Sequence, residues 1–436
     1  MEQDSWRLVA LRGLSYAGEH AVRLSLTAVL GIFVARYLGP EGLGLLSFAQ
    51  SVFGLLMPVV LLGFPAVLVR EFSTGPDWRP TLASALAAQA PIAVLVAVVG
   101  FVIVGVSRGF ETQAVLTALA MTPLPLLTAN RSVRSLLEAT GRSHVILFAG
   151  ITAGLIASTV KILAIVAAAD VWVFALAGTI EVGIVTCGLI VGIPVRPRIH
   201  SLTRYVRLSV IKDLIGESWP LLLSALAVTI YMRVDVVMLG LLASDQETGI
   251  YTAAANLSEV WYFLPMAAVA ALRPLLSRLH AQGAEGHYEW VLQRFMAGTA
   301  AVCYIAVVAI LAAGPTVIAV LYGAEYEPAT GVLQLHILAA PFVFLGVAAG
   351  PWFIDNRLSR FVLVRAGIGA VTNVFLNVLL IPAFGARGAA VATLISYASG
   401  VGLNGLSSGG RRVFWFQLRA LVLIWRPMAT PNRSDC

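Results

Sequence analysis

The sequence predicts an all-α membrane protein with about twelve transmembrane helices in two six-helix bundles and both termini in the cytoplasm. Three observations lead to this fold class. Of the 436 residues, 59% are hydrophobic and only 12% are charged, with a mean hydropathy of +0.89. A soluble domain carries about 25% charged residues, so this apolar surplus needs lipid around it. Apolar stretches of about 20 residues also recur along the chain, and basic residues favour alternate connections between them.

The apolar stretches have the length of helices that cross a bilayer. A helix needs about 20 apolar residues for roughly 30 Å of hydrocarbon, whereas a strand of a membrane barrel needs about 10. In chain order, we predict spans at residues 14–38, 42–64, 81–105, 111–130, 144–168, 171–193, 218–242, 249–272, 291–313, 331–354, 361–381 and 388–406. The first stretch contains Glu19 and Arg23 and lacks a small-residue cleavage site, which argues against a cleavable signal.

The distribution of basic residues orients these spans. Among the 29 Lys and Arg residues, Arg36, Arg108 and Arg387 fall on one side and most of the others on the opposite side. Because basic residues are retained in the cytoplasm, the crowded side is the cytoplasmic one. The net charge of +7 therefore reflects topology. No basic stripe is interleaved with aromatic residues, so nucleic acid is not an expected partner.

Two basic amphipathic segments divide the chain. The predicted organisation is an N-terminal six-helix lobe, a cytoplasmic amphipathic linker, a C-terminal six-helix lobe and a basic amphipathic cytoplasmic tail, at residues 1–193, 194–217, 218–410 and 411–436. We expect the linker to lie on the anionic inner leaflet. Residues 411–426 are either a second interfacial helix or the start of a thirteenth span. Residues 44–60 and 249–267 resemble each other weakly, which is typical of a parallel internal repeat.

Sequence motifs of soluble enzymes are missing. The chain has no Gly-rich phosphate loop, no HExxH and no GxSxG in a strand context, so we expect a transporter and not an enzyme. Cys187, Cys303 and Cys436 have no spacing typical of a metal site, and we expect no metal and no cofactor other than a coupling ion. His336, a lone histidine in an apolar span, is expected to be a packing residue.

Charged residues within the predicted spans are the candidate functional residues. A charge at mid-bilayer costs about 2.5–3.5 kcal/mol on insertion scales, so it usually faces water or a partner. The three deep basic residues are Arg23, Lys161 and Arg233. They could form a cationic cavity for an anionic head group, because arginine holds phosphate through a rigid fork. Alternatively, Lys161 could pair with Glu181, and Arg233 with Glu259, as structural ion pairs.

The deep acidic residues are candidates for coupling transport to an ion. They are Asp235, Glu259, Glu181 and Glu19. A carboxylate at this depth could take up H⁺ or Na⁺ and so couple transport to a gradient. Asp235 and Glu259 are the better candidates, because they flank an arginine at mid-depth.

Several segments resemble one family of exporters. They are ARYLGPEGLGLLSFAQS (35–51), LLGFPAVLVRE (61–71), VDVVMLGLLASDQETGIYTAAANL (234–257) and NVFLNVLLIPAFGARGAAVATLISY (373–397). Their order and spacing resemble the polysaccharide exporters of the MATE-like superfamily, the O-antigen and capsule (Wzx-type) flippases. The resemblance implies a two-lobed MATE-like bundle that works by alternating access. It also implies loop and hinge roles for Gly39, Pro40 and Gly44, and an acidic position at Asp235.

The cargo implied by the resemblance is an undecaprenyl-diphosphate-linked oligosaccharide, such as an O-antigen, capsule or exopolysaccharide repeat unit. The expected location is a bacterial or archaeal inner membrane. Membrane lipids and a polysaccharide polymerase or export complex are the other expected partners. Two alternatives stay open: a multidrug or organic-cation exporter of the same superfamily, and a membrane-embedded polysaccharide polymerase. The exporter would favour an acidic, aromatic-lined cavity, and the polymerase a large outer loop or a cluster of acidic residues at a membrane face.

Overall fold

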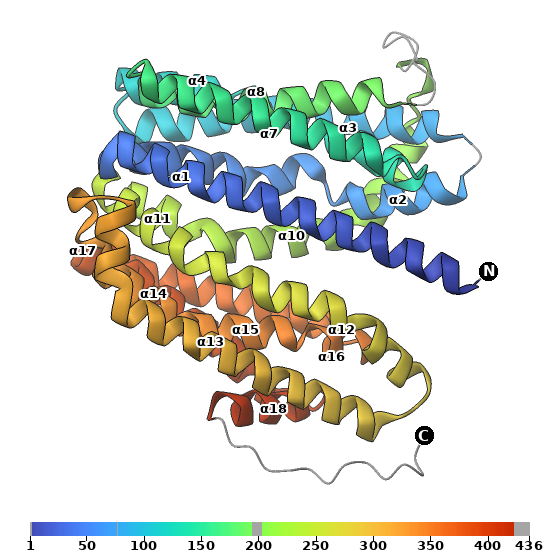
Figure 1. Ribbon diagram of the computed structural model, residues 1–436. Coiled ribbons are helices and arrows are strands. Elements are labelled where there is room, and N and C mark those ends of the chain that lie inside the picture. The colour runs from blue at the N-terminus through green and yellow to red at the C-terminus, as the bar shows by residue number, and fades with distance from the viewer. Residues whose placement is uncertain (1, 76, 194–202, 423–436) are drawn as a thin grey trace. The chain divides into compact units, whose positions relative to one another are not determined.

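The computed structural model describes residues 2–75, 77–193 and 203–422, with residues 2–28 and 359 described as helix only. The chain divides into two compact units, residues 1–249 and 250–436. Figure 1 labels most helices of both units. Those of the first unit are α1 (Glu2–Leu61), α2 (Phe64–Thr74), α3 (Trp78–Ser107), α4 (Thr112–Met121), α5 (Leu124–Thr128), α6 (Asn130–Ala139), α7 (Ser143–Val166), α8 (Val171–Val191), η1 (Thr203–Tyr205), α10 (Leu208–Leu242) and α11 (Asp245–Glu259), whose end belongs to the second unit.

The second unit is also helical. Its elements are η2 (Val260–Tyr262), α12 (Phe263–Ala281), α13 (Glu285–Leu321), η3 (Ala324–Tyr326), α14 (Ala329–His336), η4 (Ile337–Ala339), α15 (Ala340–Ala348), α16 (Gly350–Asp355), α17 (Ser359–Gly402), η5 (Leu403–Leu406) and α18 (Arg411–Leu421). No β-strand occurs in the described residues. The predicted all-α membrane fold is therefore confirmed.

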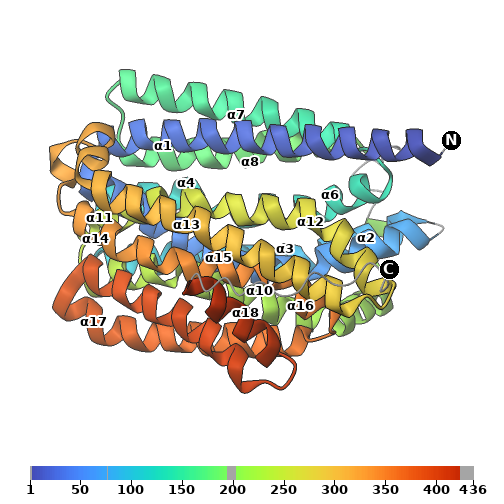
Figure 2. The same ribbon diagram turned by 60° about the horizontal axis from the view of Figure 1, so that its bottom comes forward.

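Ten helical segments of the described chain are long and apolar enough to cross a membrane. The two longest, Val29–Thr74 and Arg360–Leu406, each contain a sharp turn. Gly39 breaks α1 with φ 64° and ψ 177°, and Gly385 breaks α17 with φ 53° and ψ −133°. Figures 1 and 2 show the chain reversing at both places. Counting each as two spans is consistent with the predicted total of about twelve.

Prolines divide other spans into short helices. Pro123 separates α4 from α5, and Pro341 and Pro351 stand at the starts of α15 and α16. Proline lacks the amide hydrogen that a helix interior needs, and its ring clashes with the preceding turn. These breaks divide one predicted span of each unit, at Thr112–Ala139 and Ala329–Asp355, without ending its passage through the membrane.

The first unit is built around contacts of α1 with α3 and α10, while α7 packs along α8. Small residues allow close approach of these helices. A Cβ at Gly240 of α10 would lie 2.2 Å from the ring of Phe48, and one at Gly100 of α3 would lie 2.8 Å from that of Phe53. Both aromatic rings are buried. Packing around small residues is the usual way in which membrane helices associate.

The second unit has its own core, in which α12, α13, α15, α16 and α18 meet. Leu292, Met296, Leu345 and Trp352 belong to this cluster. Many large apolar side chains elsewhere remain exposed, such as Ile305 at 71% and others in both units. An apolar exterior of this extent fits a lipid environment. The chain is a multi-pass membrane protein.

The two amphipathic segments differ in detail from expectation. Residues 194–202 of the predicted linker lie outside the described residues, and residues 208–217 form the first turns of α10. The boundaries of the two lobes stay a prediction. At the other end, α18 has 11 residues, about 16 Å of helix, which is too short to cross a bilayer. Residues 423–426 lie outside the described part of the chain.

Candidate functional site

Arg233 lies within the membrane-spanning length of α10, and its side chain is exposed. It lies against Gly54 of α1, where an added Cβ would be 3.4 Å from Cδ of Arg233. The glycine leaves room for the aliphatic part of the arginine. Within the described chain, no ion pair joins Arg233 to an acidic side chain. A guanidinium in such a helix needs water or an anionic ligand.

Asp235 follows two residues later on α10 and is buried, with 4% of its surface exposed. Two residues rotate a helix by about 200°, so Arg233 and Asp235 point in nearly opposite directions. The structure therefore separates the exposed cation from the buried carboxylate. The ion-coupling role of Asp235 stays a prediction.

Lys161 on α7 and Glu181 on α8 are both half-buried. The two helices pack closely along each other, as expected for a helical hairpin. No ion pair joins Lys161 to Glu181, although both residues are described. The ion-pair alternative for these two residues is therefore not realised. The assignment of Lys161 to a cationic cavity stays a prediction.

The remaining charged candidates are less well placed by the structure. Arg23 and Glu19 belong to the part of α1 whose side chains lie outside the described residues. Glu259 is the last residue of α11 and belongs to the second unit, where it is half-buried. Among the described residues, no group of three or more His, Cys, Asp or Glu side chains could hold a metal ion.

The predicted hinge residues form a close contact between α1 and α11. Gly39 has the positive φ that favours glycine and allows the chain to turn before Pro40. A Cβ at Gly44 would lie 1.7 Å from the carbonyl oxygen of Asp245, and one at Gly249 would lie 1.8 Å from that of Pro40. The two backbones touch at both glycines, so no larger residue fits without a shift of one helix.

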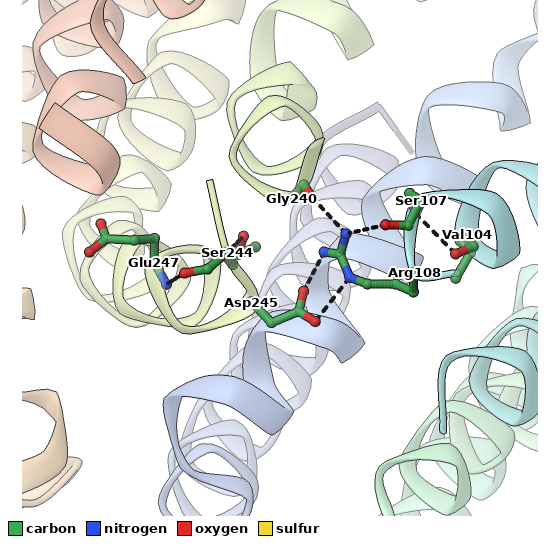
Figure 3. A network of polar contacts seen from close by, with 8 residues as sticks. Val104, Ser107, Arg108, Gly240, Ser244, Asp245 and Glu247 are labelled. Carbon is green, nitrogen blue, oxygen red and sulfur yellow. Dashed lines mark hydrogen bonds and ion pairs between the residues drawn. The ribbon is translucent and has the colours of Figure 1, made fainter. Parts of the chain in front are cut away.

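Close to this contact, an ionic network joins α3 to α10 and α11 (Figure 3). Arg108, the residue after α3, pairs with both carboxylate oxygens of Asp245, with Nε to Oδ2 at 3.0 Å. It also donates to the carbonyl oxygen of Gly240 at 2.7 Å, and its guanidinium carbon lies 4.4 Å from the ring centroid of Phe48. The two charged side chains are only 13% and 18% exposed. We call this network the outer clamp, after its predicted side of the membrane.

A second ion pair holds the opposite end of α10. Arg70 of α2 pairs with both oxygens of Glu217, with Nη2 to Oε2 at 2.6 Å, and with Glu71 at 2.9 Å. Beside it, a Cβ at Gly63 would lie 2.5 Å from the carbonyl oxygen of Ser218. The Arg70 and Glu217 side chains are 56% and 43% exposed. We call this pair the inner clamp. Together the clamps fasten α10 near its two ends to the rest of the first unit.

In the second unit, buried polar side chains form a connected chain. His336 Nδ1 lies 3.0 Å from Ser258 Oγ, and the imidazole stacks edge-to-face against Tyr251. The Tyr251 hydroxyl lies 3.2 Å from Thr393 Oγ1. His336 is 1% exposed. The histidine is therefore a hydrogen-bonded packing residue, as its isolation in the sequence indicated.

Sequence reasoning missed both clamps. Arg108 and Asp245 are 137 residues apart, and Arg70 and Glu217 are 147 apart. Taken alone, each of these four residues has the pattern of a solvent-exposed charge in a segment that connects two spans. The sequence did hold one signal for the clamps. Each clamp joins a basic and an acidic residue that the topology predicts on the same side of the membrane, close to an end of α10.

The fold and these contacts define a class of protein, a two-unit bundle of membrane-spanning helices with ionic contacts near both ends of α10. Solved structures share this fold. The structure titled lipid II flippase MurJ in an inward closed conformation superposes with a TM-score of 0.72 at 14% identity, covering 92% of this chain and 90% of that one. An inward-facing multidrug resistance MATE family transporter gives 0.67 at 15% identity, covering 92% and 95%. At these identities, the likeness shows the MATE-like fold alone.

The sequence comparison places the chain in a family. Residues 20–280 match the family described as polysaccharide biosynthesis protein. Because this match covers more than half of the 436 residues, the chain belongs to that family. Residues 220–379 also match the MatE family. The resemblance seen in the sequence is thereby confirmed.

Two archaeal proteins of Haloferax volcanii are similar to parts of the chain. One, named probable low-salt glycan biosynthesis flippase Agl15, is 24% identical over 203 residues, which are 46% of this chain and 40% of the relative. The other, named probable flippase AglR, is 29% identical over 175 residues, 39% of this chain and 36% of the relative. The matched segments thus span less than half of either relative.

Proposed function

We propose that this protein is a flippase that moves an undecaprenyl-diphosphate-linked oligosaccharide across the inner membrane by alternating access. It acts as a transporter and catalyses no covalent step. Family membership supports a role in polysaccharide biosynthesis. The names of the two partial relatives and the shared fold support transport of a lipid-linked glycan.

The observation that carries this proposal is Arg233. Its side chain is exposed on a membrane-spanning helix and has no acidic partner in the described chain. A diphosphate offers the charge and the oxygen geometry that a guanidinium binds best. Lys161, also without an ion pair there, adds a second cation in the same unit. Both residues, together with Arg23, are proposed to meet the diphosphate.

The two clamps are the contacts that we propose to break and form again during alternating access. In the proposed cycle, the inner clamp breaks while the outer clamp stays formed, so that α10 moves at its cytoplasmic end, and then the order reverses. The outer clamp is shielded from water and is reinforced by the Gly240 carbonyl and the Phe48 ring. The inner clamp is exposed and therefore weaker in water. On this basis the resting protein opens more readily towards the cytoplasm, the side where the cargo is made.

Transport is proposed to be coupled to H⁺ or Na⁺. Asp235 is the first candidate for the coupling carboxylate, because a buried acid on the helix that carries Arg233 can respond to the movement of that helix. Glu259, Glu181 and Glu19 are further candidates. A polymerase or export complex would receive the cargo on the outer side.

A complementation experiment in a deletion strain tests the proposed function. Loss of the gene should make lipid-linked repeat units accumulate on the cytoplasmic side and should remove the surface glycan. The wild-type gene should restore export, and Arg233→Ala and Arg23→Ala should not, although both variants insert in the membrane at normal levels. Full export by both alanine variants, or no accumulation in the deletion strain, would overturn the proposal.

A multidrug or organic-cation exporter is the second candidate. The match of residues 220–379 to the MatE family favours it. The same deletion strain separates the two candidates. A drug exporter predicts sensitivity to organic cations with normal surface glycan, whereas the flippase predicts the reverse.

A further inference from the structure

Helix α18, from Arg411 to Leu421, is fixed to the second unit by one of its faces. Val413, Phe416, Gln417 and Ala420 are buried there, at the spacing of one helix face. Gln417 donates to the carbonyl oxygen of Leu345 at 3.0 Å and accepts from Asn404 at 2.8 Å. The helix is therefore part of the bundle, and its orientation is set by buried hydrogen bonds as well as by apolar packing.

Further contacts hold the ends of this helix. The indole of Trp352 donates to the carbonyl oxygen of Gly409 at 3.0 Å, just before the helix begins. At the other end, the hydroxyl of Tyr304 donates to the carbonyl oxygen of Leu421 at 2.6 Å. With both ends and the centre bound, the outward face of α18 is presented in a constant direction.

The outward face carries cations on both sides of a tryptophan. Arg411, Trp415 and Arg419 follow at intervals of four residues, so they line one side of the helix, over about 12 Å. All three are exposed, with Trp415 at 51%. Arg412 is engaged by Glu289 at 2.8 Å. In the described chain, Arg411 and Arg419 have no acidic partner.

This face begins, at Arg411, at the predicted cytoplasmic end of the second unit, and the helix runs from there along α13 as far as Tyr304. The core under α18 contains Leu276 and Leu279 from the end of α12 and Tyr288 from the start of α13. The turn between those helices lies on the side where the basic residues gather. A tryptophan between two arginines suits the membrane interface, where the indole lies at headgroup level and each guanidinium can hold a phosphate.

We infer that Arg411, Trp415 and Arg419 form a binding face for anionic phospholipid headgroups of the cytoplasmic leaflet. The inference goes beyond the transport proposal and would stand if the cargo were different. Charge complementarity selects this partner, since the face has two cations without acidic partners, and that leaflet presents anionic lipid phosphates. Because Gln417 ties the same helix to α15 and to η5 after α17, a bound lipid is linked to the transmembrane helices.

Lipid titration of the purified full-length protein tests this inference. Binding of a short-chain phosphatidylglycerol and of the matching phosphatidylcholine is measured by native mass spectrometry in detergent. The wild type should retain phosphatidylglycerol in preference to phosphatidylcholine. The double variant Arg411→Gln/Arg419→Gln should lose about 25-fold in affinity, at about fivefold for each arginine. Trp415→Ala should also weaken binding, with no change in charge.

The matched control is Arg278→Gln/Arg360→Gln, which removes two exposed arginines from the same predicted side. It should bind phosphatidylglycerol within about twofold of the wild type, since lipid binding is a property of the α18 face. If both double variants lost the same affinity for phosphatidylglycerol, net charge alone would explain the binding, and the inference would be overturned. Unchanged lipid binding by Arg411→Gln/Arg419→Gln would also overturn the inference. If that variant bound lipid normally but lost export, the face would be a docking site for a protein instead. Inorganic phosphate should not displace the lipid.

Discussion

At the scale of single residues, Arg233 is the side chain on which the proposed transport depends most. Composition makes a deep arginine conspicuous, and the structure adds that its side chain is exposed and lies along Gly54. We predict that Arg233→Ala reduces glycan export by about ten- to a hundredfold, because hydrogen bonds to charged groups contribute about 1.5–3 kcal/mol. Arg233→Lys keeps the charge but loses the planar fork, so its export should be intermediate. Export is measured as surface glycan per copy of membrane-inserted protein.

Arg278→Ala serves as the control for this prediction, since it removes an exposed arginine near the end of α12. It should export normally. If Arg233→Lys performed no better than Arg233→Ala, a simple cationic contact with the cargo would be contradicted. If all three variants exported normally, Arg233 would have no role in transport.

Gly44 is a residue at which packing alone gives a sharp prediction. A Cβ there would lie 1.7 Å from the carbonyl oxygen of Asp245, so Gly44→Ala must push α1 and α11 apart. Overpacking of this kind costs about 1–3 kcal/mol, which should lower the midpoint of thermal unfolding in detergent. Gly31→Ala on the same helix, where an added Cβ meets nothing within 4 Å, should leave the midpoint unchanged or raise it. Equal midpoints for the two variants would refute the close contact.

At the level of elements, α10 is the helix whose role depends most on long-range pairing. The sequence predicted its apolar length and its deep Arg233 and Asp235. It could not predict the clamps, because they pair residues of α2, α3, α10 and α11 that are far apart in the chain. Short-range periodicity holds no information on such pairs. The same limitation applies to Lys161 and Glu181, which the sequence allows to pair and which form no ion pair with each other in the structure.

The two clamps should differ in strength. We predict that a double-mutant cycle of Arg108→Gln and Asp245→Asn gives a coupling energy of about 1–3 kcal/mol, because the charges are shielded and in direct contact. The cycle of Arg70→Gln and Glu217→Gln should give a smaller coupling that disappears at high salt, because these side chains are exposed. Both cycles are measured by unfolding of the purified protein. A larger coupling at the inner clamp would contradict the proposed preference for opening towards the cytoplasm.

Element boundaries followed chemistry that is visible in the sequence. Gly39 and Gly385 turn the chain between spans that we predicted separately, and prolines break the spans in which they occur. The exception is residues 208–217, whose charges predict an interfacial linker and which form the first turns of α10. Their charges indicated a surface position, which is compatible with a helix whose first turns extend beyond the apolar layer.

At the scale of the whole molecule, the sequence predicted the class of fold because lipid imposes simple rules. Apolar length, basic residues and helix breaks are all local properties, and together they define a multi-pass helical bundle. The division of the chain is less local. Counting the predicted spans divides the chain into two sets of six, separated at residues 194–217. The contacts within the structure instead group residues 1–249 and 250–436. Helix α10 packs against α1, α2 and α3, which places it in the first unit.

Transport by the purified protein tests the central claim most directly. The protein is reconstituted in proteoliposomes with undecaprenyl-diphosphate-linked oligosaccharide, and the glycan that reaches the opposite leaflet is measured with an impermeant enzyme. We predict transfer by the wild type and by Arg278→Ala, and a loss of about ten- to a hundredfold in Arg233→Ala at equal reconstitution. Equal transfer by Arg233→Ala and the wild type, or no transfer above empty vesicles, would contradict the account.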